Sequence, residues 1–269
     1  MPPAYAAISR QTHAAKGWRR HNGYGFAAAE AIVPLVGAEF AKAALAMPIA
    51  FVGQGAGRLR PMALLSLAAG RNLFVAPDGR WLGGYVPAAL RGHPFALLRP
   101  EGAEQSVLCV DEATGLVVDA SFPGSEPFFD AEGNPANPVR RVLDFLVQLD
   151  ANRIVTERAV VALAAAEVLV SWPLEAETPE GRKPVAGLFR VDEARLNALD
   201  SDAFLVLRVE GALPLAYAQL LSMGQLSVFQ TLIQLQAQLA QIHERQRQTI
   251  EQSFVPASTE TLSFNWDNL

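Results

Sequence analysis

Two observations on the sequence predict an α+β protein. From Gly17 to about Asp111, short apolar runs are separated by Gly and Pro, which is typical of short β-strands joined by turns. From Asn137 onward, apolar residues recur at helical spacing, as on the buried face of an α-helix. We therefore expect a mainly antiparallel or mixed β N-terminal half that also holds helices. The C-terminal half should be more helical and end in a long helix.

Five apolar runs in the N-terminal half have the length of strands: 47–52, 63–68, 73–76, 81–86 and 106–111. Segment 36–47 has the apolar spacing of a helix, and Pro48 ends it because proline cannot continue the helical hydrogen bonding. The stretch 72–82 predicts a hairpin, since Pro77 presets φ and Gly79 can adopt the positive φ of the turn.

The C-terminal half begins with two expected helices, over 139–149 and 159–169. Further elements are expected in order along the chain: strands around 167–173 and 184–191 with a polar turn at 178–183, a helix capped by Asp192, a strand at 204–209 and the longest helix at 226–252. We expect a single domain over residues 1–252 and a tail over 253–269.

The composition excludes several classes of protein. Its 269 residues are 51% apolar and 18% charged, and a chain of this size can bury a core without a disulfide or a metal. The single cysteine, Cys109, rules out an intramolecular disulfide and a multi-cysteine zinc site. The net charge of −5 argues against a nucleic-acid partner, which requires clustered Lys and Arg. Since neither a signal peptide nor a membrane-spanning run of about 18 apolar residues is visible, we expect a cytoplasmic protein without membrane insertion.

Motifs of known chemistry are weak. The glycine-rich segment 53–57 could hold a phosphate, but Pro61 follows closely and disfavours the helix that a nucleotide loop needs, so we interpret it as a hairpin loop. Cys109 lies in an alternating strand pattern and is interpreted as a buried thiol. The four histidines show no metal-binding spacing, so we expect no cofactor and no metal. A site assembled from His21, His93 and a distant carboxylate is the alternative.

Two segments, 18–26 and 81–95, combine aromatic and basic residues with Gly and Pro that fix the backbone. Arg and aromatic side chains dominate recognition surfaces because they bury a large area at low entropic cost and still form hydrogen bonds. The candidate binding residues are Trp18, Tyr24, Trp81, Tyr85, Arg91 and His93. In the alternative interpretation the aromatic residues fill the core, and Arg91 then needs a buried carboxylate partner.

The last helix and the tail offer further candidate contacts. Four apolar residues of the helix have the spacing of a coiled-coil seam: Leu232, Leu235, Leu239 and Ile242. Helix 226–250 could therefore pair in a homo-oligomer or pack on its own domain. Phe264 and Trp266 stand among polar residues in the tail, where they either anchor to the body or dock to another protein.

Several segments together resemble the bacterial SapC family: Tyr24-Gly-Phe-Ala27, Pro48-Ile-Ala-Phe51, Asp78-Gly-Arg-Trp81, Tyr85-Val-Pro-Ala-Ala-Leu-Arg-Gly-His-Pro-Phe95 and Phe128-Phe-Asp-Ala-Glu-Gly133. The resemblance covers about residues 5 to 240. It implies a link to a bacterial surface layer and to neighbouring genes for TonB-dependent receptors, cupin-like proteins and proteins like flavin-dependent tryptophan halogenases. It supplies no catalytic residue.

These observations favour a non-catalytic binding or accessory protein that serves a surface or nutrient-uptake system, with another protein as its partner. The competing hypothesis is an enzyme whose site is dispersed along the chain around His21, Glu39, Arg91 and His93, with a metal or a small acidic substrate.

Overall fold

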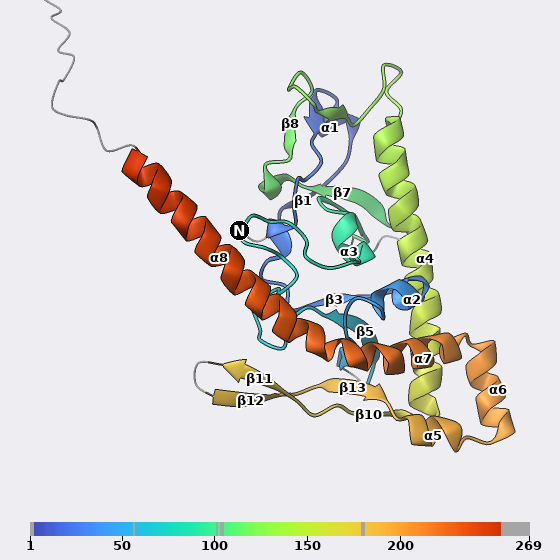
Figure 1. Cartoon of the computed structure of the whole chain (residues 1–269). Coiled ribbons are helices and arrows are strands. Elements are labelled where there is room, and N and C mark those ends of the chain that lie inside the picture. The colour runs from blue at the N-terminus through green and yellow to red at the C-terminus, as the bar shows by residue number, and fades with distance from the viewer. Residues whose placement is uncertain (1–2, 56, 101, 103–104, 179–180, 254–269) are drawn as a thin grey trace, which may run out of the picture.

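The computed structural model describes residues 3–55, 57–100, 102, 105–178 and 181–253, and it confirms the α+β class (Figure 1). The first half contains, in order, β1 (Tyr5–Ala7), α1 (Arg10–His13), β2 (Lys16–Trp18), η1 (Gly25–Ala27), β3 (Ile32–Pro34), η2 (Gly37–Glu39), α2 (Phe40–Ala43), β4 (Ile49–Gly53), β5 (Leu59–Leu64), α3 (Ala88–Arg91), β6 (Phe95–Leu98), β7 (Val107–Asp111), η3 (Glu112–Thr114), β8 (Val117–Asp119) and β9 (Glu126–Pro127). The second half contains α4 (Asn137–Ala165), β10 (Leu169–Ser171), β11 (Leu174–Thr178), β12 (Gly181–Val185), β13 (Leu188–Val191), α5 (Glu193–Asn197), α6 (Ser201–Val209), α7 (Ala212–Ser222), η4 (Met223–Leu226) and α8 (Ser227–Ser253).

Every strand pairing among the described residues is antiparallel. The largest sheet has the order β10-β13-β4-β5-β3, and two three-stranded sheets have the orders β1-β7-β6 and β8-β2-β9. β11 and β12 form a separate hairpin. The loop between β4 and β5 closes with a hydrogen bond from the amide of Gln54 to the carbonyl of Arg58, so the glycine-rich segment is the hairpin loop that the sequence predicts.

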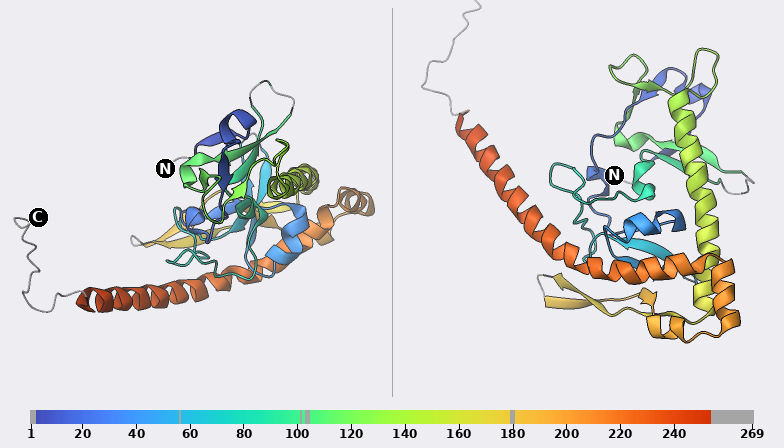
Figure 2. Two further views of the ribbon diagram at one scale, coloured as in Figure 1. Left: turned by 90° about the horizontal axis from the view of Figure 1, so that it is seen from above. Right: turned by 45° about the vertical axis from the view of Figure 1, so that its right-hand side comes forward.

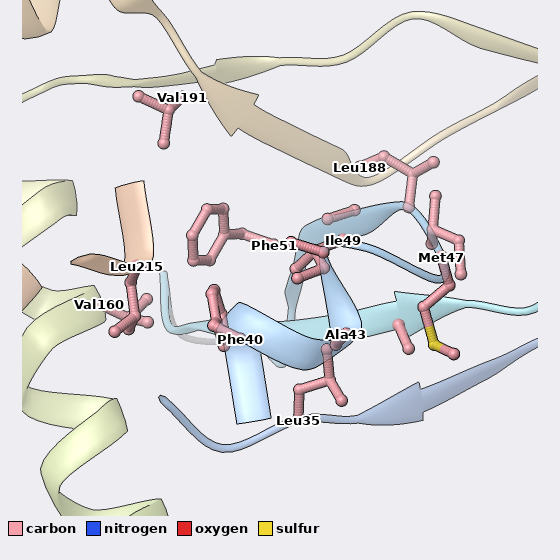
Figure 3. Close-up of a cluster of buried hydrophobic side chains, with 14 of the residues drawn as sticks. Leu35, Phe40, Ala43, Met47, Ile49, Phe51, Val160, Leu188, Val191 and Leu215 are labelled. Atoms are coloured by element: carbon pink, nitrogen blue, oxygen red, sulfur yellow. The ribbon is translucent and has the colours of Figure 1, made fainter. Parts of the chain in front are cut away.

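The larger hydrophobic core fills the space between the five-stranded sheet, the C-terminal part of α4, and α2 and α7. Figure 3 shows ten of its labelled side chains converging from these elements: Leu35, Phe40, Ala43, Met47, Ile49, Phe51, Val160, Leu188, Val191 and Leu215. Apolar surface removed from water stabilises a fold by about 25 cal/mol per Å². This core buries continuous runs of β4 and β5, at residues 49–51 and 61–64.

A smaller core lies between the two three-stranded sheets and the N-terminal part of α4. Its buried members are Trp18, Phe95, Val110, Phe128, Val139 and Leu146. Helix α4 is 29 residues long and contributes to both cores (Figure 1). The surface between the two cores is where the candidate site is found.

Several sequence-based expectations need correction. The two helices expected over 139–149 and 159–169 are one continuous helix, α4, because the intervening residues are also helical and Arg153 bridges Asp150 and Glu157 on its surface. Segment 36–47 shortens to η2 and α2. Segments 73–76 and 81–86 are irregular, with one isolated bridge between Val75 and Trp81 in place of a regular hairpin.

The strand expected at 204–209 is instead part of helix α6. Its N-terminal turn is capped by the carboxylate of Asp200, which accepts a hydrogen bond from the amide of Ala203. The cap expected at Asp192 is confirmed, since that carboxylate accepts from the amide of Arg195. Cys109 is buried in β7, and burial raises the pKa of its thiol.

Helix α8 packs on the body at its N-terminal end and then projects away from it (Figure 2). Phe229 and Leu232 join the larger core. The side-chain amide of Gln236 donates to the carbonyl oxygens of Leu73 and Val75 at 2.9 and 3.0 Å. Farther along, Ile242 is 51% exposed. In the described part of the chain no single helix is long and apolar enough to cross a membrane. The segments 201–209 and 212–249 meet the criterion of length and composition only when taken together, across a 92° bend.

Candidate functional site

The loop that joins β5 to β6 carries four of the eight candidate binding residues: Trp81, Tyr85, Arg91 and His93. It is fixed by the buried carboxylate of Glu39, which is 5% exposed. Its Oε1 accepts hydrogen bonds from the hydroxyl of Tyr85 at 2.7 Å and from the amide of Ala88 at 2.6 Å. Its Oε2 accepts from the amide of Val36 at 3.1 Å. Burial and the hydrogen bond with Glu39 raise the pKa of Tyr85, so the phenol stays protonated and acts as a donor. Glu39 thus ties the loop to η2.

An aromatic cluster lies beside the hydrogen bonds of Glu39 and includes residues of the same loop. The indole of Trp81 donates to the carbonyl oxygen of Tyr85 at 2.8 Å, and the rings of Trp81 and Tyr24 meet edge to face at 5.5 Å between centroids. Phe26 stacks on the imidazole of His93 with 3.7 Å between centroids. Aromatic pairs in these geometries contribute about 0.5–1.5 kcal/mol beyond their buried area, so the cluster holds the loop rigid.

Beside this cluster lies a pocket of about 490 Å³, which we call the arginine pocket. Its polar lining consists of Trp18, Arg20, His21, Arg91, His93 and Arg141. Its apolar lining consists of Phe95, Pro138, Val142 and Phe145. The pocket therefore lies between β2, the segment that follows it, α3 and the first turns of α4. Figure 1 shows α3 beside α4.

The charge of the arginine pocket is positive. Arg20 pairs with Glu126 at 2.8 Å, but neither Arg91 nor Arg141 has a carboxylate partner among the residues that the structure describes. The guanidinium of Arg91 lies over the rings of Phe145 and Tyr85, at 5.3 and 5.8 Å from their centroids. No lining residue is acidic. The N-terminal turn of α4, whose amides carry partial positive charge, also borders the pocket.

The two imidazoles of the pocket are neutral at pH 7. Burial and the neighbouring His21 lower the pKa of His93 to about 4, and burial lowers the pKa of His21. Nδ1 of His21 lies 2.9 Å from the carbonyl oxygen of Gly23 and must donate to it, so Nε2 of the neutral ring is an acceptor. The His21 and His93 centroids are 5.8 Å apart. The pocket therefore offers imidazole acceptors beside guanidinium donors.

Trp18 is 4% exposed and lines the pocket, yet its indole Nε1 has no hydrogen-bond partner in the described structure. Glu126, directly opposite Trp18 in the β2–β9 pair, has an unpaired buried Oε2. Leaving such a group unsatisfied costs about 1–3 kcal/mol. Both atoms are buried on neighbouring strands, and of the two residues only Trp18 lines the pocket.

A second, larger pocket of about 960 Å³ lies between the β4–β5 hairpin and the C-terminal half of α4. Its charged side chains are already compensated in part, since Arg158 pairs with Glu210 at 3.1 Å and Glu157 with Arg153 at 2.7 Å. None of the candidate residues from the sequence lines it. The arginine pocket is therefore the better candidate site.

Comparison with known proteins identifies the family. The model of the SapC family matches residues 8–228, which is most of the chain. The chain belongs to the SapC family. Neither the curated proteins nor the solved structures contain a match to this SapC-family chain, so its site is assigned from geometry alone.

The SapC-family fold brings the candidate residues of its described part together at one surface. Trp18, Arg91 and His93 line the arginine pocket, whereas Tyr24, Trp81 and Tyr85 form the cluster behind it. Of the aromatic residues that the core interpretation covers, Phe95 is buried in the smaller core, and Trp81 and Tyr85 pack against the larger core. Trp18 is buried as well. Trp81 and Tyr85 are only partly buried and Arg91 is exposed, so a buried carboxylate partner for Arg91 is not needed.

Some predicted residues lie elsewhere. Phe264 and Trp266 lie outside the described residues. Glu39 binds the loop and does not line the pocket, and no group of three or more potential metal ligands occurs in the described ranges. Sequence reasoning missed Arg141 and Phe145, which α4 brings to the pocket. The available signal was their position within the first turns of an amphipathic helix, flanking Val142 of the buried stripe.

Proposed function

We propose that this SapC-family chain is a non-catalytic binding protein that holds its ligand in the arginine pocket. The observation that carries the proposal is the pair of guanidiniums, Arg91 and Arg141, which face a concave surface without a carboxylate partner in the described structure. Positive charge gathered without compensation, in a chain of net charge −5, is typical of a binding site rather than of a stabilising ion-pair network.

The finer role that we propose is an accessory one, in a bacterial surface-layer or TonB-linked nutrient-uptake system with another protein as partner. This role rests on what the SapC resemblance implies. In that arrangement the ligand is held without any residue of α8, and docking of the partner protein is assigned to the tail over 253–269.

An enzyme built around His21, Arg91 and His93 is the competing candidate, and their common position in the pocket favours it. General-base chemistry needs an imidazole oriented by a hydrogen-bonded partner and within reach of a nucleophile. Within the described ranges, neither ring forms a hydrogen bond with a carboxylate or a hydroxyl group. The geometry therefore supports binding better than turnover.

The test is equilibrium dialysis of a small-molecule extract from the native host against the full chain, followed by mass spectrometry. Arg91→Gln serves as the comparison protein. A compound that the wild type retains above Arg91→Gln, and that is recovered with its mass unchanged, is the expected result. Conversion of that compound, or equal retention by the two proteins, would contradict the proposal.

A further inference from the structure

We propose that the ligand of the arginine pocket is an organic anion, with a carboxylate or phosphate head group on an apolar, planar body. This inference rests on the proposed binding function and adds the chemical class of the ligand. It is drawn from two features of the pocket: the arrangement of its guanidiniums and its apolar walls.

The guanidiniums determine the charge of the ligand. Arg91 and Arg141 approach the pocket from α3 and α4, and Arg20 approaches from the segment after β2. Arginine presents a rigid fork of N–H donors that matches the oxygens of carboxylates and phosphates. The rings of Phe145 and Tyr85 beneath the Arg91 guanidinium restrict its rotamers, so less entropy is lost when it binds an anion. A cationic ligand would face repulsion from the two uncompensated guanidiniums, Arg91 and Arg141.

The remaining walls determine the body of the ligand. Phe95, Pro138, Val142 and Phe145 give the pocket an apolar lining, and its volume of about 490 Å³ lies within the range of small-molecule sites. Inorganic phosphate alone would leave this apolar surface uncovered. A planar ring between Phe145 and the Trp18 side of the pocket would bury it while the anionic head contacts the guanidiniums.

The polar atoms of the pocket favour a head group that accepts hydrogen bonds. The guanidiniums of Arg91 and Arg141 carry only N–H donors, and neither has a carboxylate partner in the described structure. The imidazoles of His21 and His93 add no positive charge at neutral pH. The guanidiniums therefore provide both the charge and the hydrogen-bond donors for the head group.

The test uses four defined probes on the full chain: phenylacetate, phenyl phosphate, their uncharged analogue 2-phenylethanol, and inorganic phosphate. The indole N–H signals of the four tryptophans are followed by ¹⁵N NMR, with the Trp18 signal assigned through Trp18→Phe. We expect saturable shifts of the Trp18 signal with phenylacetate or phenyl phosphate. The tighter of the two identifies the head group. 2-Phenylethanol and inorganic phosphate should bind roughly tenfold more weakly or not at all.

Arg91→Gln should weaken binding of the anionic probe by roughly tenfold or more. Arg140→Gln is the matched control, because Arg140 carries the same charge on α4, pairs with Asp130 at 3.8 Å and does not line the pocket. Equal affinity for 2-phenylethanol and the anionic probes would overturn the inference, as would no saturation of either anion by about 10 mM. A neutral or cationic host compound that is retained above Arg91→Gln and recovered unchanged would also overturn it, while leaving the proposed binding function intact.

Discussion

Replacing Glu39 with alanine should destabilise the protein by about 3 kcal/mol. The substitution leaves the amides of Val36 and Ala88 buried without an acceptor, and each stranded amide costs about 1–3 kcal/mol. The hydroxyl of Tyr85 also loses its acceptor but is only partly buried. Removing a buried carboxylate relieves its desolvation, which returns part of the loss. The net change is therefore smaller than the sum of the lost hydrogen bonds.

Two milder variants each remove only part of the hydrogen bonding at Glu39. Tyr85→Phe removes one of the three donors and leaves the carboxylate with both amides, so we expect a loss of about 1 kcal/mol. Glu39→Gln should fall between the two, because its amide nitrogen would have to face a backbone donor.

Equilibrium unfolding in urea measures all three variants, and their m-values should equal that of the wild type. A loss below about 0.5 kcal/mol for Glu39→Ala lies within the range of ordinary surface substitutions. Such a result would refute the conclusion that Glu39 holds the loop in place. A loss for Tyr85→Phe as large as that for Glu39→Ala would refute it as well, because the hydroxyl and not the two amides would then carry the stabilisation.

Three further predictions follow from the site and its surroundings. The free energy of unfolding should fall as pH drops from 6.5 towards 4. In this window the unfolded chain protonates His93, while the folded chain, in which the pKa of His93 is about 4, does not. Urea unfolding measured across this pH range should show a flatter profile for His93→Gln. Gly83→Ala would place a Cβ 2.7 Å from the ring of Phe74 and should cost about 1–3 kcal/mol in thermal unfolding, whereas Gly84→Ala, with open space at its Cβ, should cost under about 1 kcal/mol. If α8 pairs with a second copy through its leucine seam, light scattering should show an oligomer that Leu235→Asp reduces to a monomer, and a wild-type monomer at the same concentration would exclude that pairing.

Local patterns predicted the fold where one physical signal dominates. β4 and β7 were found because each is a short apolar run of strand length, and α8 because its apolar residues recur at helical spacing. The cap at Asp192 was found because its chemistry is local. Segment 204–209 was mistaken for a strand because Phe, Leu and Val fit both structures. Its helical state depends on the cap at Asp200 and on the burial of Leu207 in the larger core, and burial is a tertiary property.

The site was predicted in part for a similar reason. Trp18, Arg91 and His93 stood out because aromatic and basic residues were concentrated within short segments. Arg141 did not, because its role depends on the direction in which α4 crosses the smaller core, which no local pattern specifies. The contacts of Glu39 were also invisible, since its three donors lie 3, 46 and 49 residues away along the chain.

Binding of an organic anion at the arginine pocket is tested most directly by titrating the tighter anionic probe into wild type, Arg141→Gln and Arg140→Gln under identical conditions. The two variants remove the same charge from neighbouring positions on α4, but only Arg141 lines the pocket. We expect Arg141→Gln to weaken binding by roughly tenfold and Arg140→Gln to leave it within about twofold of the wild type. Equal affinities of the two variants would contradict binding at this pocket.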